Sequence, residues 1–469
     1  MPTSAVRFIH ALRYADIPES ARHAARRALL DTLGTAAAGS TTRASRILRD
    51  HAARFHGTGD GDAGNGGADG GGTGARLIFD GRRVAPPGAA MAGAGTIDAV
   101  DAHDGHRLTK GHVGVTVVPA LLAFCDEMAP CDGEEFLTRL VLGYEIATRA
   151  GIALHRTAAD YHTSGAWNAL AAAAIGARAL GLSPGETEHA LGIAEYYGPR
   201  SPMMRVIDHP TMLKDGSTLG AFSGVGAALL AADCFTGAPA VTVMAENVAD
   251  LWADLGQRWR IEEQYIKAYP VCRWAQPAVE AVLSLRRAES LTAGQIAGVT
   301  IHSFTEAVRL ATRLPQDTDA AQYSLPFPVA AALVHGRLGI AEIDGAGLTD
   351  PGVLALSAAM VLVEEQDYCA RFPAERWAHA VIDLKDGRRL TSDPCAARGD
   401  PEAPFSDADL IAKFHDLAGP VLGPDRARRL EAACLGIDGA SGPGTLAEIL
   451  RAPAEPPPAS AASLKAIIV

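Results

Sequence analysis

The sequence lacks long apolar runs and long runs of positive charge. No apolar run reaches the roughly 18 residues of a membrane-spanning helix, so we expect no contact with a membrane. The 42 lysine and arginine residues are outnumbered by 54 aspartate and glutamate residues, giving a net charge of -12, and no basic run exceeds a few residues. This distribution excludes the basic surface that nucleic-acid binding requires.

The seven cysteines are scattered and form no CxxC pair. Their spacing argues against zinc ribbons and iron–sulfur ligation and favours free thiols in a reducing compartment. The first segment, MPTSAVRFIHALRYADIP, carries charges throughout and lacks the apolar core of a signal peptide. We therefore expect a cytoplasmic protein.

Aromatic residues make up only 6% of the chain, whereas Ala-rich segments are frequent. From about residue 87 to 255 these segments alternate with Gly, Pro and polar turns, which predicts a compact all-α domain with closely packed helices.

After Lys267 the pattern changes. Residues 297–304 and 378–394 are strand-like, and the second stretch predicts a hairpin with Asp386-Gly387 at its turn.

With 469 residues the chain is long enough for two or three domains. We predict a mainly α fold, in which a large helical domain (1–266) is interrupted by a smaller inserted α/β lid domain (267–405). The C-terminal helices (406–469) are predicted to return to the first domain, because the pattern becomes helical again at Ser406. Residues 57–74, nearly all Gly, Asp and small polar residues, predict a disordered loop, and the Pro/Ala-rich end predicts a flexible tail.

Residues 98–112 hold the highest density of chemically active side chains. Eight of these fifteen positions are titratable or cationic, and they lie between the apolar stretches AAMAGAG and VGVTVVPALLAF. Histidine and aspartate suit proton transfer at neutral pH or metal binding, so we predict the centre of an active site here. Candidate bases are Asp101 and His103, and candidate acids are His112 and His162. Candidate substrate contacts in the same segment are Asp104, His106 and Lys110.

A metal site is the competing interpretation of this segment. Aspartate and histidine bind divalent ions. However, Arg107 and Lys110 would repel a cation, and no HExxH motif occurs in the chain. We therefore expect neither a metal nor another cofactor.

Three basic residues stand just before predicted helix starts: His112, His162 and Lys214. Free backbone N–H groups and the helix dipole favour an anion at such positions. If the three helix starts converge, they form a pocket for carboxylates, although spacing alone does not show that they converge.

A Pro-interrupted loop at the predicted domain boundary adds further candidates. Lys267, Tyr269 and Arg273 lie in this loop, and clefts at domain boundaries are common ligand sites. Arg273 suits bidentate binding of a carboxylate. Cys272 is better explained as a small buried hydrophobic residue.

These motifs resemble blocks of the MmgE/PrpD family, and the similarity covers almost the whole chain. The family pattern H-x-x-D-x-D-D followed by HPG resembles Asp98–Asp104 and His112-Val113-Gly114, and K-x-Y-P-x-C-R-W is matched by Lys267–Trp274. Further blocks resemble His162–Gly165, Leu213-Lys214 and Tyr323–Phe327.

Four positions depart from the family pattern. Asp98 replaces the first histidine, Val113 replaces the proline of HPG, Gln276 replaces a histidine, and Phe327 replaces a frequent tyrosine. These changes suggest a substrate or reaction that differs from those of the best-known members.

The family includes 2-methylcitrate dehydratase, cis-aconitate decarboxylase and iminodisuccinate epimerase. The resemblance implies a helical domain with an inserted lid, usually in a homodimer. It also implies a cofactor-independent lyase of the dehydratase type, which removes a proton α to a carboxylate of a small di- or tricarboxylate and expels a β leaving group. Three alternatives stay open: a decarboxylase of a cis-aconitate-like acid, an epimerase or isomerase, and a non-enzymatic helical binding protein.

Overall fold

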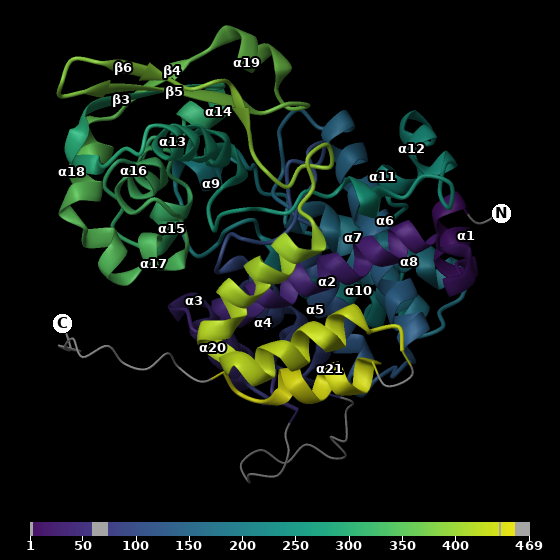
Figure 1. Ribbon diagram of the computed structural model, residues 1–469. Coiled ribbons are helices and arrows are strands. Elements are labelled where there is room, and N and C mark those ends of the chain that lie inside the picture. The colour runs from purple at the N-terminus through teal and green to yellow at the C-terminus, as the bar shows by residue number, and fades with distance from the viewer. Residues whose placement is uncertain (1–2, 59–73, 440–441, 455–469) are drawn as a thin grey trace.

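The structure, a computed structural model, describes residues 3–58, 74–439 and 442–454 (Figure 1). The predicted Gly-rich disordered loop lies outside the described residues except at its edges, and so does most of the predicted flexible tail. The fold is mainly α, as predicted. Within the described part of the chain, no helix is both long and apolar enough to cross a membrane.

The first part of the chain builds a helical body. A short antiparallel pair of strands, β1 (Ala75–Arg76) and β2 (Arg83–Val84), lies beside it. The helices of this body are α1 (Ser4–Ala11), α2 (Glu19–Gly39), α3 (Arg43–Phe55), α4 (Pro86–Asp98), α5 (Gly114–Cys125), α6 (Gly133–Thr157), α7 (Gly165–Ala179), α8 (Pro184–Tyr197), α10 (Ser217–Ala232), α11 (Val241–Met244) and α12 (Asp250–Ala253). The short helix α9 (Met204–Asp208) packs instead on the second lobe, through Ile207.

Small residues allow the helices of the body to pack closely. On α10, a Cβ atom added to Gly224 would lie 2.3 Å from the backbone oxygen of Ala169 on α7, and one added to Gly220 would lie 2.7 Å from the Cα of Gly165. Larger side chains at these positions would force α7 and α10 apart. This close contact fixes the N-terminal ends of both helices, which lie near the site described below.

The second lobe is an α/β unit with its own sheet. The strands are β3 (Ile296–Ser303), β4 (Val361–Glu364), β5 (Trp377–Leu384), β6 (Arg389–Thr391) and β7 (Cys395–Ala396). Its helices are α13 (Gln276–Ala288), α14 (Thr305–Val308), α15 (Thr318–Gln322), α16 (Pro326–His335), α17 (Ile340–Ile343), α18 (Pro351–Ala359) and α19 (Gln366–Arg371).

The sheet has the order β4-β3-β5-β6, with β7 paired to β5. The expected hairpin is confirmed: β5 and β6 are antiparallel, and Gly387 adopts the left-handed conformation of the turn, with φ 89°. Alternate residues of β5 are buried, and α13 packs against this strand (Figure 1). The short strand β4 pairs parallel with β3, and the sequence pattern had not predicted it.

The chain ends in α20 (Asp407–Leu435), which bends at Gly423, and α21 (Gly442–Arg451). Helix α20 packs along α2, where Lys413 pairs with Asp31 at 2.5 Å. One apolar core therefore combines residues from both ends of the chain. A second core comprises residues of the range 269–384 together with Met203 and Ile207. The junction between these two cores holds the candidate site.

Candidate active site

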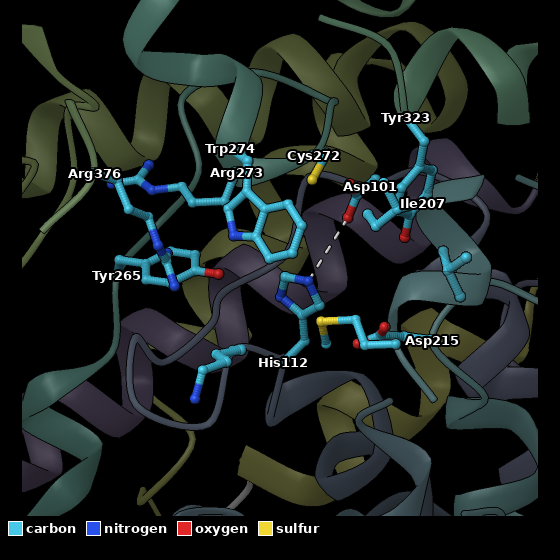
Figure 2. Close-up of a pocket in the computed structure, with 13 residues that line it drawn as sticks. Asp101, His112, Ile207, Asp215, Tyr265, Cys272, Arg273, Trp274, Tyr323 and Arg376 are labelled. Carbon is cyan, nitrogen blue, oxygen red and sulfur yellow. Dashed lines mark ion pairs between the residues drawn. The ribbon is translucent and has the colours of Figure 1, made fainter. Parts of the chain in front are cut away.

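A narrow cavity of about 30 Å³ lies where the two cores meet (Figure 2). Both parts of the fold contribute to its wall, because loops before α5 and α10 face residues of the second lobe. The lining residues are Asp101, Lys110, His112, Met203, Val206, Ile207, Asp215, Tyr265, Cys272, Arg273, Trp274, Tyr323 and Arg376.

His112 is held rigidly at the wall of this cavity. Its backbone N–H donates to the Ser164 hydroxyl at 2.9 Å, and its backbone oxygen accepts from the Asn168 amide at 2.6 Å. Its ring Nδ1 lies 2.6 Å from the carbonyl oxygen of Asp104. Because a carbonyl can only accept, the proton must be on Nδ1, and the lone pair of the neutral ring is on Nε2.

The environment keeps this ring neutral. Burial, followed by the positive charge of Lys267, holds the pKa of His112 well below its usual value. Nε2 therefore offers a lone pair at physiological pH. It lies 3.9 Å from an Asp101 oxygen, too far for a hydrogen bond but on the same side of the cavity (Figure 2).

Asp101 and Lys267 form a fully buried ion pair. The Lys267 ammonium donates to the Asp101 carboxylate and, at 3.3 Å, to its backbone oxygen. Burial alone would raise the pKa of Asp101, but Lys267 and the neighbouring histidines outweigh it and hold that pKa well below its usual range. Asp101 is thus a fixed negative charge and a poor proton acceptor.

Asp215 has the opposite character. Burial, reinforced by the nearby negative charge of Asp98, raises the pKa of Asp215 to about 7. The hydroxyl of Ser164 donates to its carboxyl group, so Ser164 links Asp215 to the backbone of His112. Near neutral pH a large fraction of Asp215 carries a proton. A buried acid of this kind suits proton donation.

Three cationic side chains face the cavity. Burial lowers the pKa of Lys110 to about 8, and its ammonium lies 4.2 Å from the centre of the Tyr161 ring. Arg273 and Arg376 lie 4.6 Å and 5.6 Å from the Tyr265 ring. A cavity with this much positive charge favours an anionic ligand.

Two family models match successive parts of the chain. The family models for the MmgE/PrpD N-terminal domain and the MmgE/PrpD C-terminal domain match residues 4–255 and 269–437. The chain belongs to the MmgE/PrpD family. The C-terminal model includes α20, although this helix packs on the helical body.

Two similar family members come from fungi. The cis-aconitate decarboxylase-like protein oryM of Aspergillus oryzae is 24% identical over 410 residues, which cover 76% of this chain and 80% of that protein. A cis-aconitate decarboxylase of Aspergillus terreus is 23% identical over 419 residues, covering 81% and 84% of the two chains.

Of the four residues that depart from the family pattern, two make polar side-chain contacts and two are apolar. Asp98 accepts from the Nε2 of His103 at 3.3 Å, and the His103 ring lies edge-on to His112 at 4.4 Å. Gln276 uses its amide to bind the backbone oxygens of residues 269 and 271 and to accept from Arg273. Val113 and Phe327 are buried, and their hydrocarbon side chains offer no polar group in place of the family's tyrosine or proline turn.

Three basic residues were predicted to form a pocket at helix starts, and two of them, His162 and Lys214, do not line the cavity. His162 is half-buried, with its Nδ1 2.9 Å from the Asp160 oxygen and its ring stacked on His155. Lys214 is buried and pairs with Asp319 at 2.6 Å, while its ammonium lies 5.5 Å from the ring of the cavity residue Tyr323. His112 alone of the three lines the cavity.

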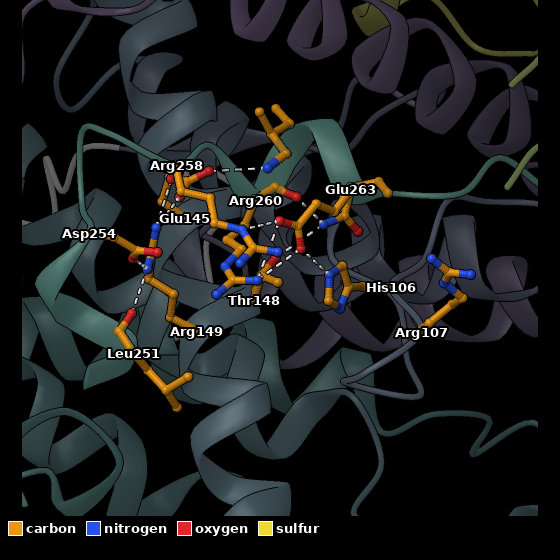
Figure 3. Close-up of polar contacts among 12 residues, drawn as sticks. His106, Arg107, Glu145, Thr148, Arg149, Leu251, Asp254, Arg258, Arg260 and Glu263 are labelled. Atoms are coloured by element: carbon orange, nitrogen blue, oxygen red, sulfur yellow. Dashed lines mark hydrogen bonds and ion pairs between the residues drawn. The ribbon is translucent and has the colours of Figure 1, made fainter. Parts of the chain in front are cut away.

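Three further predicted substrate contacts also have partners elsewhere. His106 faces Glu263 at 3.2 Å, within an arginine–glutamate network of the helical body (Figure 3). Tyr269 donates to Glu280 at 3.0 Å. Asp104 accepts from the hydroxyl of Tyr144 at 2.5 Å and from the backbone N–H of Gly114, so its side chain supports the start of α5.

The sequence interpretation missed two cavity residues with an acidic or a basic side chain, Asp215 and Arg376. Asp215 immediately precedes Gly216, the N-cap of α10, and belongs to no motif that indicates a buried acid. Arg376 stands directly before β5 without any local motif. The tertiary fold alone brings it beside residues of the 98–112 segment.

Asp101, His103 and His112 also have the spacing of a metal site, because one ligand atom from each lies within 4.8 Å of the others. The Lys267 ammonium, however, already pairs with the Asp101 oxygen. A divalent cation would have to displace this buried charge.

We therefore expect activity to survive exhaustive dialysis against EDTA. The measurement is turnover before and after chelation, with the residual metal content checked by mass spectrometry. Activity that is lost on chelation and returns with one particular divalent ion would contradict this expectation.

Proposed function

We propose that this protein is a cofactor-independent lyase that acts on a small di- or tricarboxylate. The observation that carries the proposal is the neutral His112, whose free Nε2 faces a cavity that also presents Lys110, Arg273 and Arg376. A base beside several cations is the arrangement needed to remove a proton from the carbon next to a carboxylate. The same arrangement speaks against a purely structural helical protein, whose polar residues would be scattered and exposed.

In the dehydratase form of the reaction, His112 takes the proton from the α carbon. The electron pair of the broken C–H bond forms the new double bond, and a hydroxyl group leaves the β carbon. Asp215, with its pKa raised to about 7 by burial, supplies the proton that turns the leaving group into water. Negative charge that accumulates on the substrate carboxylate is stabilised by the cations of the cavity.

Decarboxylation is the second candidate, because both fungal relatives described above are named for cis-aconitate decarboxylase. In this case the bond from carbon to a carboxylate breaks, carbon dioxide leaves, and the remaining electron pair accepts a proton. Protonated Asp215 is suited to provide that proton. The same cavity serves either reaction, since both pass through a carbanion next to a carboxylate.

The narrowness of the cavity supports a lid function for residues 267–405. A space of about 30 Å³ holds only one or two water molecules, so a citrate-like acid enters only when the two lobes separate. Closure then excludes water from the reacting carbon.

A homodimer is the assembly we propose. Large apolar side chains are exposed along and beside α8 and α10, which is typical of a protein–protein interface. They include Tyr196, Tyr197, Leu213, Leu219 and Phe235.

The proposal is tested by incubating the purified protein with a panel of citrate-like acids and reading the products by mass spectrometry. We expect one acid to lose the mass of water or of carbon dioxide. A product of unchanged mass but altered configuration would indicate an isomerase instead. Binding without any product would contradict the lyase assignment.

A further inference from the structure

We propose that Arg376 binds a second carboxylate of the substrate, remote from the reacting carbon, and thereby selects acids with at least two carboxylates. This inference rests on the proposed function, because it assigns a ligand group within the same cavity.

Arg376 is a buried cation, and the part of the chain that the structure describes provides no counter-ion for it. Its residue is 5% exposed, and among the described residues its Nε and Nη1 have no hydrogen-bond partner. The remaining nitrogen, Nη2, makes one long contact of 3.4 Å with the backbone oxygen of Arg107. A buried charge without a partner is costly, so such a group in a cavity wall indicates a ligand of opposite charge.

Arg273 provides an internal comparison, because it stands beside the same Tyr265 ring (Figure 2). Its guanidinium pairs with Asp400 at 2.7 Å and donates to the backbone oxygens of residues 397 and 398. It also donates to Gln276 at 3.1 Å. Arg273 therefore holds the loop that forms the wall, whereas Nε and Nη1 of Arg376 have no partner among the described residues and can bind a ligand.

The position of Arg376 identifies the part of the substrate that it contacts. It stands before β5 in the second lobe, whereas His112 belongs to the segment that precedes α5 in the helical body. Lys110 lies near Arg376, whose charge contributes to lowering the pKa of Lys110, after burial. Lys110 and Arg376 thus form a pair of neighbouring cations away from the base and Asp101, and a carboxylate bound there is the one remote from the reacting carbon.

Planar guanidinium groups bind carboxylates with directed, charge-assisted hydrogen bonds. A monocarboxylic acid would leave the donors of Arg376 unpaired in the closed cavity. On this proposal, the single side chain of Arg376 discriminates dicarboxylates from monocarboxylates.

The experiment measures equilibrium binding of succinate and butyrate, which differ in one terminal carboxylate, by calorimetry on the full-length protein. Wild-type protein should bind succinate more tightly than butyrate. Arg376→Gln should weaken succinate binding by about 10- to 100-fold and leave butyrate binding nearly unchanged. Arg376→Lys, which keeps the charge but not the planar donors, should give an intermediate loss.

Arg371→Gln is the matched control. Arg371 lies in the same lobe and pairs at the surface with Asp367 and Glu375, so its loss should alter neither affinity. Arg376→Gln should also keep or raise the melting temperature, because it removes an unpaired buried charge. A purely structural arginine would lower it.

Equal affinity of wild type and Arg376→Gln for succinate would overturn the inference, and so would an equal loss for succinate and butyrate. Failure of wild type to bind any di- or tricarboxylate would overturn it as well. Binding that depends on Arg376 in a protein that converts no acid of the panel would uphold this inference and contradict the lyase assignment alone.

Discussion

His112→Asn should lower kcat by about 10²- to 10⁴-fold while the melting temperature stays close to that of wild type. The shorter amide can still donate to the Asp104 carbonyl, as the ring Nδ1 does at 2.6 Å, but it has no atom in place of Nε2. The two backbone hydrogen bonds of residue 112 do not depend on its side chain. The variant thus removes the base and preserves the hydrogen bonds that hold residue 112. Steady-state kinetics measures the loss of kcat, and thermal unfolding measures the stability.

His162→Asn is the matched control, because His162 lies outside the cavity lining and should tolerate the change. The pH profile of wild type provides a second check. A base must be neutral, so activity falls when the pH drops through its pKa, and burial places the pKa of His112 well below 6.5. Activity should therefore persist below pH 6.5, and it should decline above pH 7 as Asp215 loses its proton. A His112→Asn variant with nearly normal turnover would remove His112 from the mechanism.

Lys267→Met should lower the free energy of unfolding by about 3–5 kcal/mol, because it leaves Asp101 buried without its partner. Both side chains of this pair are almost completely inaccessible, so water cannot replace the lost ammonium. Denaturation by urea measures the change. Lys385→Met, at an exposed position of the β5–β6 turn, is the control and should change stability little.

A double variant shows whether the unpaired charge of Asp101 causes the loss of stability. Asp101→Asn combined with Lys267→Met removes both charges and should be more stable than Lys267→Met alone. An exposed ion pair contributes up to about 1 kcal/mol to stability. If Lys267→Met lowers the free energy of unfolding by less than this amount, leaving Asp101 unpaired does not destabilise the fold, and the prediction is wrong.

Local sequence patterns predicted the secondary structure well where periodicity is strong. The Ala-rich segments between about residues 87 and 255 form helices such as α7 and α10, and the turn residues Asp386 and Gly387 predicted the β5–β6 hairpin. Strand β4 was missed because four residues are too few to establish a period, and its pairing with β3 depends on a partner about sixty residues away.

The candidate site could be predicted only in part. The density of charge in residues 98–112 indicated the segment that supplies Asp101, Lys110 and His112 to the cavity. A basic residue before a helix start does not reveal which way its side chain faces, and His162 and Lys214 found partners elsewhere. Arg376 reaches the cavity only through the packing of two separate cores, which no local pattern encodes.

Helix α20 has a consequence for the order in which the chain folds. Its residues Leu410 and Phe414 complete a core that includes Leu29 and Leu33 of α2, so the helical body stays open until α20 has been synthesised. The second lobe draws its core mainly from residues 269–384 and can close earlier on the ribosome. The nascent body thus exposes the apolar face of α2 throughout the synthesis of the insert, until α20 covers it.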